Sequence, residues 1–209
     1  MKKIGIIDYG VGNIRSISNA ISNFGVEALL TDSRDEILDC SGIILPGVGA
    51  FRHGIEKLKE KNLDLILADF IASNKPLLGI CLGMQMLFTS SSEFGTSEGL
   101  GFIEGTVEQL PIQENCKLPH IAWTSIYPNS NRSWNNTLLN DVEINSDMYH
   151  VHSYFVNPTD EDYILSLSSY NDFQFCSTVQ KNNILGCQYH PEKSGEAGLS
   201  VIKNFMELT

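Results

Sequence analysis

Short apolar runs alternate with helical patterns in the first half of the chain. Strands are predicted at residues 4–8, 26–31, 42–46 and 76–80, and helical periodicity covers residues 13–24 and most of 51–73. The runs IGII, GIIL and PLLGI are apolar at every position, as in parallel strands that helices cover on both faces. This order of elements predicts an α/β fold with a doubly wound, largely parallel sheet.

The pattern changes after residue 99, where strands follow one another without long helices between them. Six strand-like runs are predicted, at residues 102–109, 120–127, 148–156, 163–170, 175–180 and 185–190. Turn residues at 157–158, 171–172 and 181–183 separate these runs, and the last two turns predict hairpins. Antiparallel strands should therefore extend the parallel core. A polar loop at 129–136 is expected on the surface, and a helix at 195–208 closes a single domain of residues 1–209.

Composition narrows the function classes. A net charge of −11 argues against a nucleic-acid or anionic-membrane surface. Asp8 interrupts the first apolar run too early for a signal peptide, and no segment is long enough to span a bilayer. Five cysteines form no C-x-x-C pair, which is typical of a reducing compartment. We therefore expect a cytoplasmic protein.

The stretch GICLG, residues 79–83, contains the first candidate catalytic group. A predicted strand passes directly into a helical pattern at Cys81, which forces a sharp turn. Flanking glycines allow strand and helix to pack closely, as in the serine nucleophile elbow, and the first N–H groups of the helix face the nucleophile. A small buried cysteine would give the same pentapeptide, so the stretch alone leaves both interpretations open.

The sequence QYHPE near the end of the chain supplies a base for this thiol. His190 follows an apolar strand, and Glu192 lies two residues on, on the same side if the backbone stays extended. A carboxylate on one imidazole nitrogen and a thiol on the other form a catalytic triad. A third segment, residues 45–49 (LPGVG), ends the third strand at the same sheet edge. Its turn can direct a backbone N–H at an oxyanion, although an ordinary strand-to-helix turn has the same composition.

Together, PGVGAF, GICLGMQ and QYHPEKSG resemble the class I (triad) glutamine amidotransferases. DYGVGN and YHVHSY add a resemblance to the glutaminase subunits of imidazole glycerol phosphate synthase. The resemblance covers nearly the whole chain and implies a flavodoxin-like fold of this class.

The resemblance also implies a mechanism and its residues. Cys81 would attack the carboxamide of L-glutamine, His190 would transfer protons, and Glu192 would orient His190. The backbone N–H of Leu82 and one from Gly47 or Val48 would bind the oxyanion. By position, Gln85 and Glu93 resemble the glutamine-binding side chains, and His152, Ser153 and Tyr154 resemble the cradle for the α-carboxylate. No cofactor is implied.

The resemblance implies a partner as well. Ammonia would pass to a (β/α)₈ cyclase subunit in a heterodimer, as in histidine biosynthesis, with Asn13, Trp123 and Tyr149 near the docking face. The family pattern around Trp123 has glycine before it and asparagine after it, where this chain has Ala122 and Thr124. These differences leave open a related subunit that supplies ammonia for amidination of a sugar in surface polysaccharide.

Other classes remain as alternatives. A partner-independent cysteine hydrolase would share the elbow, and an interaction module would share the fold without the chemistry. Arg15 stands where a dinucleotide-binding G-x-G-x-x-G needs its third glycine. No metal site is expected, because His150 and His152 have no further ligand at a recognisable spacing.

Overall fold

A computed structural model describes residues 2–111, 117–130 and 132–209 of the chain; Cys116 lies outside these residues. Its main sheet has the order β2-β1-β3-β4-β14-β13-β11-β7-β5-β6. The first five strands in this order are mutually parallel. They are β2 (Glu27–Thr31), β1 (Lys3–Ile7), β3 (Gly42–Leu45), β4 (Leu77–Ile80) and β14 (Ile184–Cys187). The predicted parallel core is therefore confirmed.

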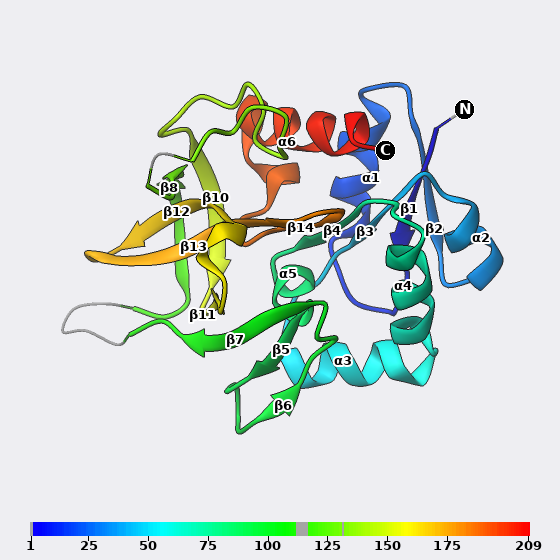
Figure 1. Ribbon diagram of the computed structural model, residues 1–209, viewed down its shortest axis with the longest axis horizontal. Helices are drawn as coiled ribbons and strands as arrows, with labels where there is room; N and C mark the ends of the chain where they lie inside the picture. The colour runs from blue at the N-terminus through cyan, green and yellow to red at the C-terminus, as the bar shows by residue number, and fades with distance from the viewer. Residues whose placement is uncertain (1, 112–116, 131) are drawn as a thin grey trace.

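Antiparallel strands extend this core, as the sequence predicts (Figure 1). The hairpin turns between β12 and β13 and between β13 and β14 fall at the predicted residues 171–172 and 182–183. The added strands are β13 (Phe173–Lys181), β12 (Ile164–Tyr170), β11 (Tyr154–Pro158), β9 (Tyr127–Pro128), β7 (Ile103–Gln109), β5 (Phe88–Ser91) and β6 (Ser97–Glu98). All of these pairings are antiparallel except that of β5 with β7, which is parallel. Strand β8 (His120–Ser125) pairs only with β10 (Asp147–His152), in a separate two-stranded sheet.

Helices cover both faces of the parallel strands. Figure 1 shows α1 (Ile14–Ser22) and α6 (Gly195–Glu207) on one side, and α3 (Phe51–Glu60) and α4 (Leu63–Ala72) on the other. Two apolar clusters fill the two interfaces, with α2 (Arg34–Asp39) and α5 (Leu82–Met86) packed into the α3–α4 side. Every residue of β3, β4 and β14 is buried, which explains why their sequences are apolar throughout.

The structure corrects four details of the predicted elements. The helix predicted over 51–73 is two helices, because Asn62 adopts a left-handed conformation (φ 54°). The helical pattern predicted directly after Cys81 is a short helix that ends at Met86 and is followed by β5. The strand predicted over 148–156 is split at Ser153 between two sheets. The turn expected at 157–158 is instead the end of β11.

The loop at 129–136 has no regular secondary structure in its described residues, but it is not only surface. The Trp134 side chain is buried and its indole N–H donates to the Leu165 carbonyl at 2.9 Å. Composition alone did not predict this packing, because seven of the eight residues in the loop are polar and a single aromatic side chain anchors it. Within the described residues, none of the helices is long and apolar enough to cross a membrane.

Candidate active site

Cys81 lies at the sharp turn that the sequence predicts. It follows β4 directly and precedes α5, with backbone angles φ 55° and ψ −112° that non-glycine residues rarely adopt. A Cβ atom on Gly79 would lie 2.7 Å from the Gly83 backbone, and one on Gly83 would lie 1.9 Å from the Leu45 carbonyl oxygen. The glycines therefore allow strand and helix to approach so closely that the chain must reverse at the thiol.

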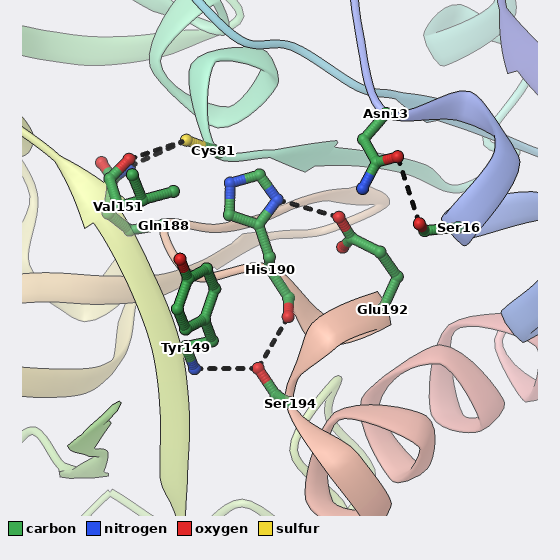
Figure 2. Close-up of polar contacts among 9 residues, drawn as sticks. All are labelled: Asn13, Ser16, Cys81, Tyr149, Val151, Gln188, His190, Glu192 and Ser194. Carbon is green, nitrogen blue, oxygen red and sulfur yellow. Dashed lines mark hydrogen bonds and ion pairs between the residues drawn. The ribbon is translucent and has the colours of Figure 1, made fainter. Parts of the chain in front are cut away.

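His190 and Glu192 form the second part of the site. The imidazole Nδ1 lies 2.9 Å from the Glu192 carboxylate, and both side chains are buried. The expected extended backbone is wrong, because Pro191 begins a short 3-10 helix, Pro191–Lys193, that brings Glu192 back toward the ring. Figure 2 shows the imidazole between Cys81 and Glu192. The other ring nitrogen, Nε2, has no hydrogen-bond partner within the described residues.

The environment of His190 favours its protonated form. Burial lowers the pKa of the imidazole, but the neighbouring Cys81 sulfur and the Glu192 carboxylate together outweigh burial and raise the pKa to about 10. A histidine with this pKa is an imidazolium at neutral pH. It can therefore stabilise a thiolate and protonate a leaving group.

Two neighbours of the Cys81 sulfur were not predicted from the sequence. The thiol donates to the Val151 carbonyl oxygen, with an S···O distance of 3.9 Å, and the Gln188 amide nitrogen donates to the sulfur over 3.8 Å (Figure 2). Val151 is on β10 and Gln188 follows β14. The alternating pattern along β10 could have pointed to Val151, and a polar side chain within a buried run could have pointed to Gln188. Neither signal identifies a contact with Cys81.

The turn after β3 packs against the start of α5. A Cβ atom on Gly47 would lie 2.8 Å from the Gly83 nitrogen and 2.9 Å from the Leu82 Cβ, so glycine is required for this approach. The Tyr9 hydroxyl donates to the Pro46 carbonyl at 2.7 Å and fixes the turn from β1. Val48 is half-exposed and lines the same pocket as Cys81. The structure thus brings together the backbone segments expected to form the oxyanion hole.

A cavity of about 350 Å³ opens beside the thiol. Its lining contains two of the three triad residues, all the residues named for substrate binding, and residues from the oxyanion turn, from the start of α5, from β10 and just before β8: Val48, Gly49, Cys81, Leu82, Gln85, Glu93, Pro119, Val151, His152, Ser153, Tyr154 and His190. A more open hollow of about 460 Å³ lies around Trp134, and none of the catalytic candidates lines it. The chemistry therefore assigns the smaller cavity as the site.

The predicted glutamine-binding side chains are tied to the walls of this cavity. The Gln85 amide nitrogen donates to the Tyr154 carbonyl at 2.9 Å, and one Glu93 oxygen accepts the Phe51 N–H at 2.6 Å. The imidazole of His152 contacts the same Tyr154 carbonyl at 2.9 Å through Nδ1. Ser153 lies between β10 and β11, where the chain changes sheets. All three residues expected to form the carboxylate cradle, His152, Ser153 and Tyr154, line the cavity.

Three histidines, His120, His150 and His152, form a cluster behind this wall. All are buried, and one ring nitrogen from each lies within 4.8 Å of the others. The sequence pattern does not predict that His120 lies near the other two histidines, because its pairing with His152 depends on the register of β8 and β10. Hydrogen bonds join His150 Nδ1 to His152 Nε2 at 3.2 Å and His120 Nε2 to the Thr124 hydroxyl at 2.9 Å. Within the part of the chain that the structure describes, the cluster contains three imidazoles and no carboxylate, and two of these rings already hydrogen-bond to each other.

Two of the three predicted docking residues are neighbours. Trp123 on β8 is 56% exposed, and its ring lies 6.0 Å from that of Tyr149 on β10, which in turn lies 6.4 Å from His190. Asn13 precedes α1 and accepts a hydrogen bond from Ser16 at 3.1 Å, on the Glu192 side of the imidazole in Figure 2. An exposed tryptophan and a partly buried tyrosine thus adjoin the catalytic candidates.

Comparison with known proteins agrees with this geometry. The family model described as "Glutamine amidotransferase class-I" matches residues 5–208. "Imidazole glycerol phosphate synthase subunit HisH 1" of Legionella pneumophila (strain Lens) is 39% identical, with both chains covered completely. The HisH subunit of Bacillus cytotoxicus is 44% identical over 97% of this chain and 93% of its own.

Solved structures show the same fold at low identity. PurLQS from Thermotoga maritima superposes with a TM-score of 0.74 at 18% identity, covering 99% of this chain and 98% of its own. A structure titled as a glutamine amidotransferase has a TM-score of 0.72 at 17% identity, covering 98% and 97%. From its sequence relatives and its fold together, the chain belongs to the class I glutamine amidotransferase family, among the HisH subunits of imidazole glycerol phosphate synthase.

Proposed function

We propose that this protein hydrolyses L-glutamine to glutamate at Cys81 and delivers the ammonia to a (β/α)₈ cyclase partner, as the glutaminase subunit of imidazole glycerol phosphate synthase in histidine biosynthesis. One observation gives the strongest support for glutamine hydrolysis at this site. Cys81 lies in a strained turn beside a buried His190 whose far nitrogen is held by Glu192 at 2.9 Å. This combination supplies a nucleophile, a proton donor and an orienting carboxylate.

The residues divide the reaction between them. The Cys81 sulfur attacks the carboxamide carbon of glutamine, and the tetrahedral intermediate collapses as the C–N bond breaks. His190, protonated because of its raised pKa, gives its Nε2 proton to the departing nitrogen, which leaves as ammonia. Neutral His190 then takes a proton from water that attacks the thioester. Glutamate leaves, and the proton returns to the thiol–imidazole pair.

The oxyanion would be held by backbone donors on two elements. Leu82 opens α5, and the turn containing Gly47 and Val48 packs against it from β3. Neighbouring positions of β3 and β4 in the sheet support this assignment, because they place both turns at the same edge. Gln85, Glu93 and the backbone at 152–154 would bind the amino-acid end of the substrate, since all line the cavity beside the thiol.

The partner assignment rests on the relatives and on the exposed Trp123 with its neighbour Tyr149. The relatives named above are subunits of imidazole glycerol phosphate synthase, which favours histidine biosynthesis over a sugar-amidating role. Trp123 is 56% exposed and lies beside Tyr149, whose ring is 6.4 Å from that of His190, so a partner that covers Trp123 would lie close to the source of ammonia. We further propose that the chain is one glutaminase domain in the cytoplasm. The main sheet that runs from β2 to β6 and the buried free thiols of the described cysteines support this.

Glutamate release tests the proposal. The purified chain is incubated with glutamine alone and with a (β/α)₈ cyclase subunit, and we expect weak release alone and strong stimulation by the partner. Cys81→Ala should abolish release in both conditions while complex formation, measured by gel filtration, persists. Full activity without partner would favour an independent cysteine hydrolase. Unchanged release from Cys81→Ala would overturn the assignment of the nucleophile.

A further inference from the structure

Gln188 is a buried polar residue to which the mechanism above assigns no task. It lies between β14 and His190, and its exposed fraction is zero. Its backbone N–H donates to the Ser177 carbonyl at 2.9 Å, and the preceding carbonyl, of Cys187, accepts the N–H of Cys81 at 2.8 Å. The backbone of Gln188 is therefore fixed against both β13 and the nucleophile turn, which restricts where its amide can point.

The orientation of this amide follows from a chain of hydrogen bonds that begins at Tyr154. A backbone carbonyl only accepts, so the group that Gln85 directs at the Tyr154 oxygen, 2.9 Å away, must be its NH₂. The same NH₂ lies 3.0 Å from the side-chain oxygen of Gln188. Gln188 must therefore direct its own NH₂ the other way, toward the Cys81 sulfur at 3.8 Å.

Two consequences follow for the site. Both amide protons of Gln85 are engaged by protein acceptors, so only its carbonyl oxygen remains to accept a hydrogen bond from a ligand. The sulfur of Cys81 has an N–H donor on the side of Gln188, and a donor stabilises a thiolate more than a thiol. One buried amide thus affects both substrate binding and the nucleophile.

We propose that Gln188 is a positioning residue that donates to the Cys81 sulfur and fixes the Gln85 amide with its carbonyl oxygen toward the substrate's amino group. Only the part of this inference that concerns the Gln85 amide and the substrate rests on the proposed glutaminase function. The contact with the sulfur is a property of the free protein and can be tested without substrate.

Two variants separate the two contacts. Gln188→Met keeps the length of the side chain and removes both its donor and its acceptor. Gln188→Glu retains an acceptor for Gln85 but has no N–H for the sulfur. Gln180→Met is the matched control, because the side-chain oxygen of Gln180 also accepts a hydrogen bond, in this case from the Leu138 N–H at 3.0 Å, but Gln180 does not line the cavity.

The first measurement is the rate of Cys81 alkylation by iodoacetamide across pH, with the modified peptide identified by mass spectrometry. Gln188→Met and Gln188→Glu should both shift the rate profile to higher pH and slow alkylation at pH 7 severalfold, while Gln180→Met follows wild type. A structural role alone would lower the melting temperature of Gln188→Met without moving the profile. Wild-type alkylation profiles in both folded Gln188 variants would overturn the proposal.

The second measurement is glutamate release in the presence of the barrel partner. Gln188→Met should lose about tenfold or more in kcat/KM, with KM raised because the Gln85 amide can rotate. Gln188→Glu should keep KM within about twofold and lose kcat, because the acceptor for Gln85 is retained while the donor to the sulfur is replaced by a carboxylate oxygen that disfavours the thiolate. Equal losses of kcat with unchanged KM in both variants would overturn the part assigned to Gln85. If wild type itself releases no glutamate, the proposed function fails, and the alkylation result still decides the contact with the sulfur.

Discussion

Mild acid should destabilise this protein through the cluster of His120, His150 and His152. Burial, with a smaller contribution from the neighbouring His120, lowers the pKa of His152 from 6.5 to about 3. Burial also lowers the pKa of His150 well below its usual value. Between about pH 6.5 and pH 3 these imidazoles therefore bind protons in the unfolded chain but stay neutral in the folded cluster. Over this window the folded state loses stability as the pH falls.

The size of the effect can be worked out for His152. At pH 5 the solution is about 1.5 units below the pKa of an exposed imidazole, and each unit corresponds to about 1.4 kcal/mol. This one ring should therefore remove about 2 kcal/mol of unfolding free energy between pH 7.5 and pH 5. For a chain of 209 residues that loss lowers the melting temperature by about 4–8 °C. The raised pKa of His190 acts in another window, because its stabilisation is complete below pH 6.5 and is lost as the pH rises toward 10.

Urea unfolding followed by circular dichroism at pH 7.5, 6 and 5 measures this loss. His150→Phe isolates the cluster from the carboxylates that also titrate in acid, since Phe175 and Tyr189 already surround position 150 with rings 5.5 and 5.7 Å away. The substitution leaves His152 without one hydrogen-bond donor, so the unfolding free energy of the variant at pH 7.5 should be lower than that of wild type. Its unfolding free energy should, however, depend less steeply on pH. His53→Gln, at an exposed position of α3, is the control and should retain the wild-type slope. Identical slopes in wild type and His150→Phe would refute the reasoning.

Three further predictions concern the elbow, the base and the docking face. Gly83→Ala should lower the free energy of unfolding by about 2–4 kcal/mol, because its methyl group would overlap a backbone carbonyl. At Gly49→Ala the methyl group meets no atom within 4 Å, so this variant should lose only about 1–2 kcal/mol, from its positive φ. Urea unfolding midpoints measure both losses of stability. Glu192→Gln should move the alkaline limb of kcat/KM to lower pH by about one unit, because the carboxylate helps to raise the pKa of His190. Trp123→Ala should weaken binding of the barrel partner by about tenfold or more, measured by calorimetry.

Each of these has an outcome that contradicts it. Equal stability losses in the two glycine variants would show that the close approach at Gly83 is relieved by a shift of the backbone. An unmoved alkaline limb in Glu192→Gln would mean that the carboxylate only orients the ring. For Trp123→Ala, Ile121→Ala is the comparison, because Ile121 is similarly exposed on the same strand. If the two variants bind equally, the aromatic residue has no special part in docking.

The sequence alone determined the parallel core and the principal members of the site. Runs that are apolar at every position can only be buried on both faces, so their order along the chain predicts parallel strands. Loops at the carboxyl ends of such strands meet at one edge. The local signals at residues 79–83 and 188–192 were sufficient to nominate Cys81 and His190 as nucleophile and base. That β4 and β14, which these residues follow, are neighbours in the sheet comes from the structure.

Only the tertiary structure decided the contacts that depend on register and on side-chain orientation. His120 joins His152 because β8 and β10 pair in one register among several that their sequences allow. Gln188 reaches the Cys81 sulfur across 107 residues of sequence. The direction of its amide is imposed by a carbonyl on β11, through Gln85. Periodicity reports which side of an element is buried, but it contains no information about which buried groups meet, because that depends on how separate elements pack.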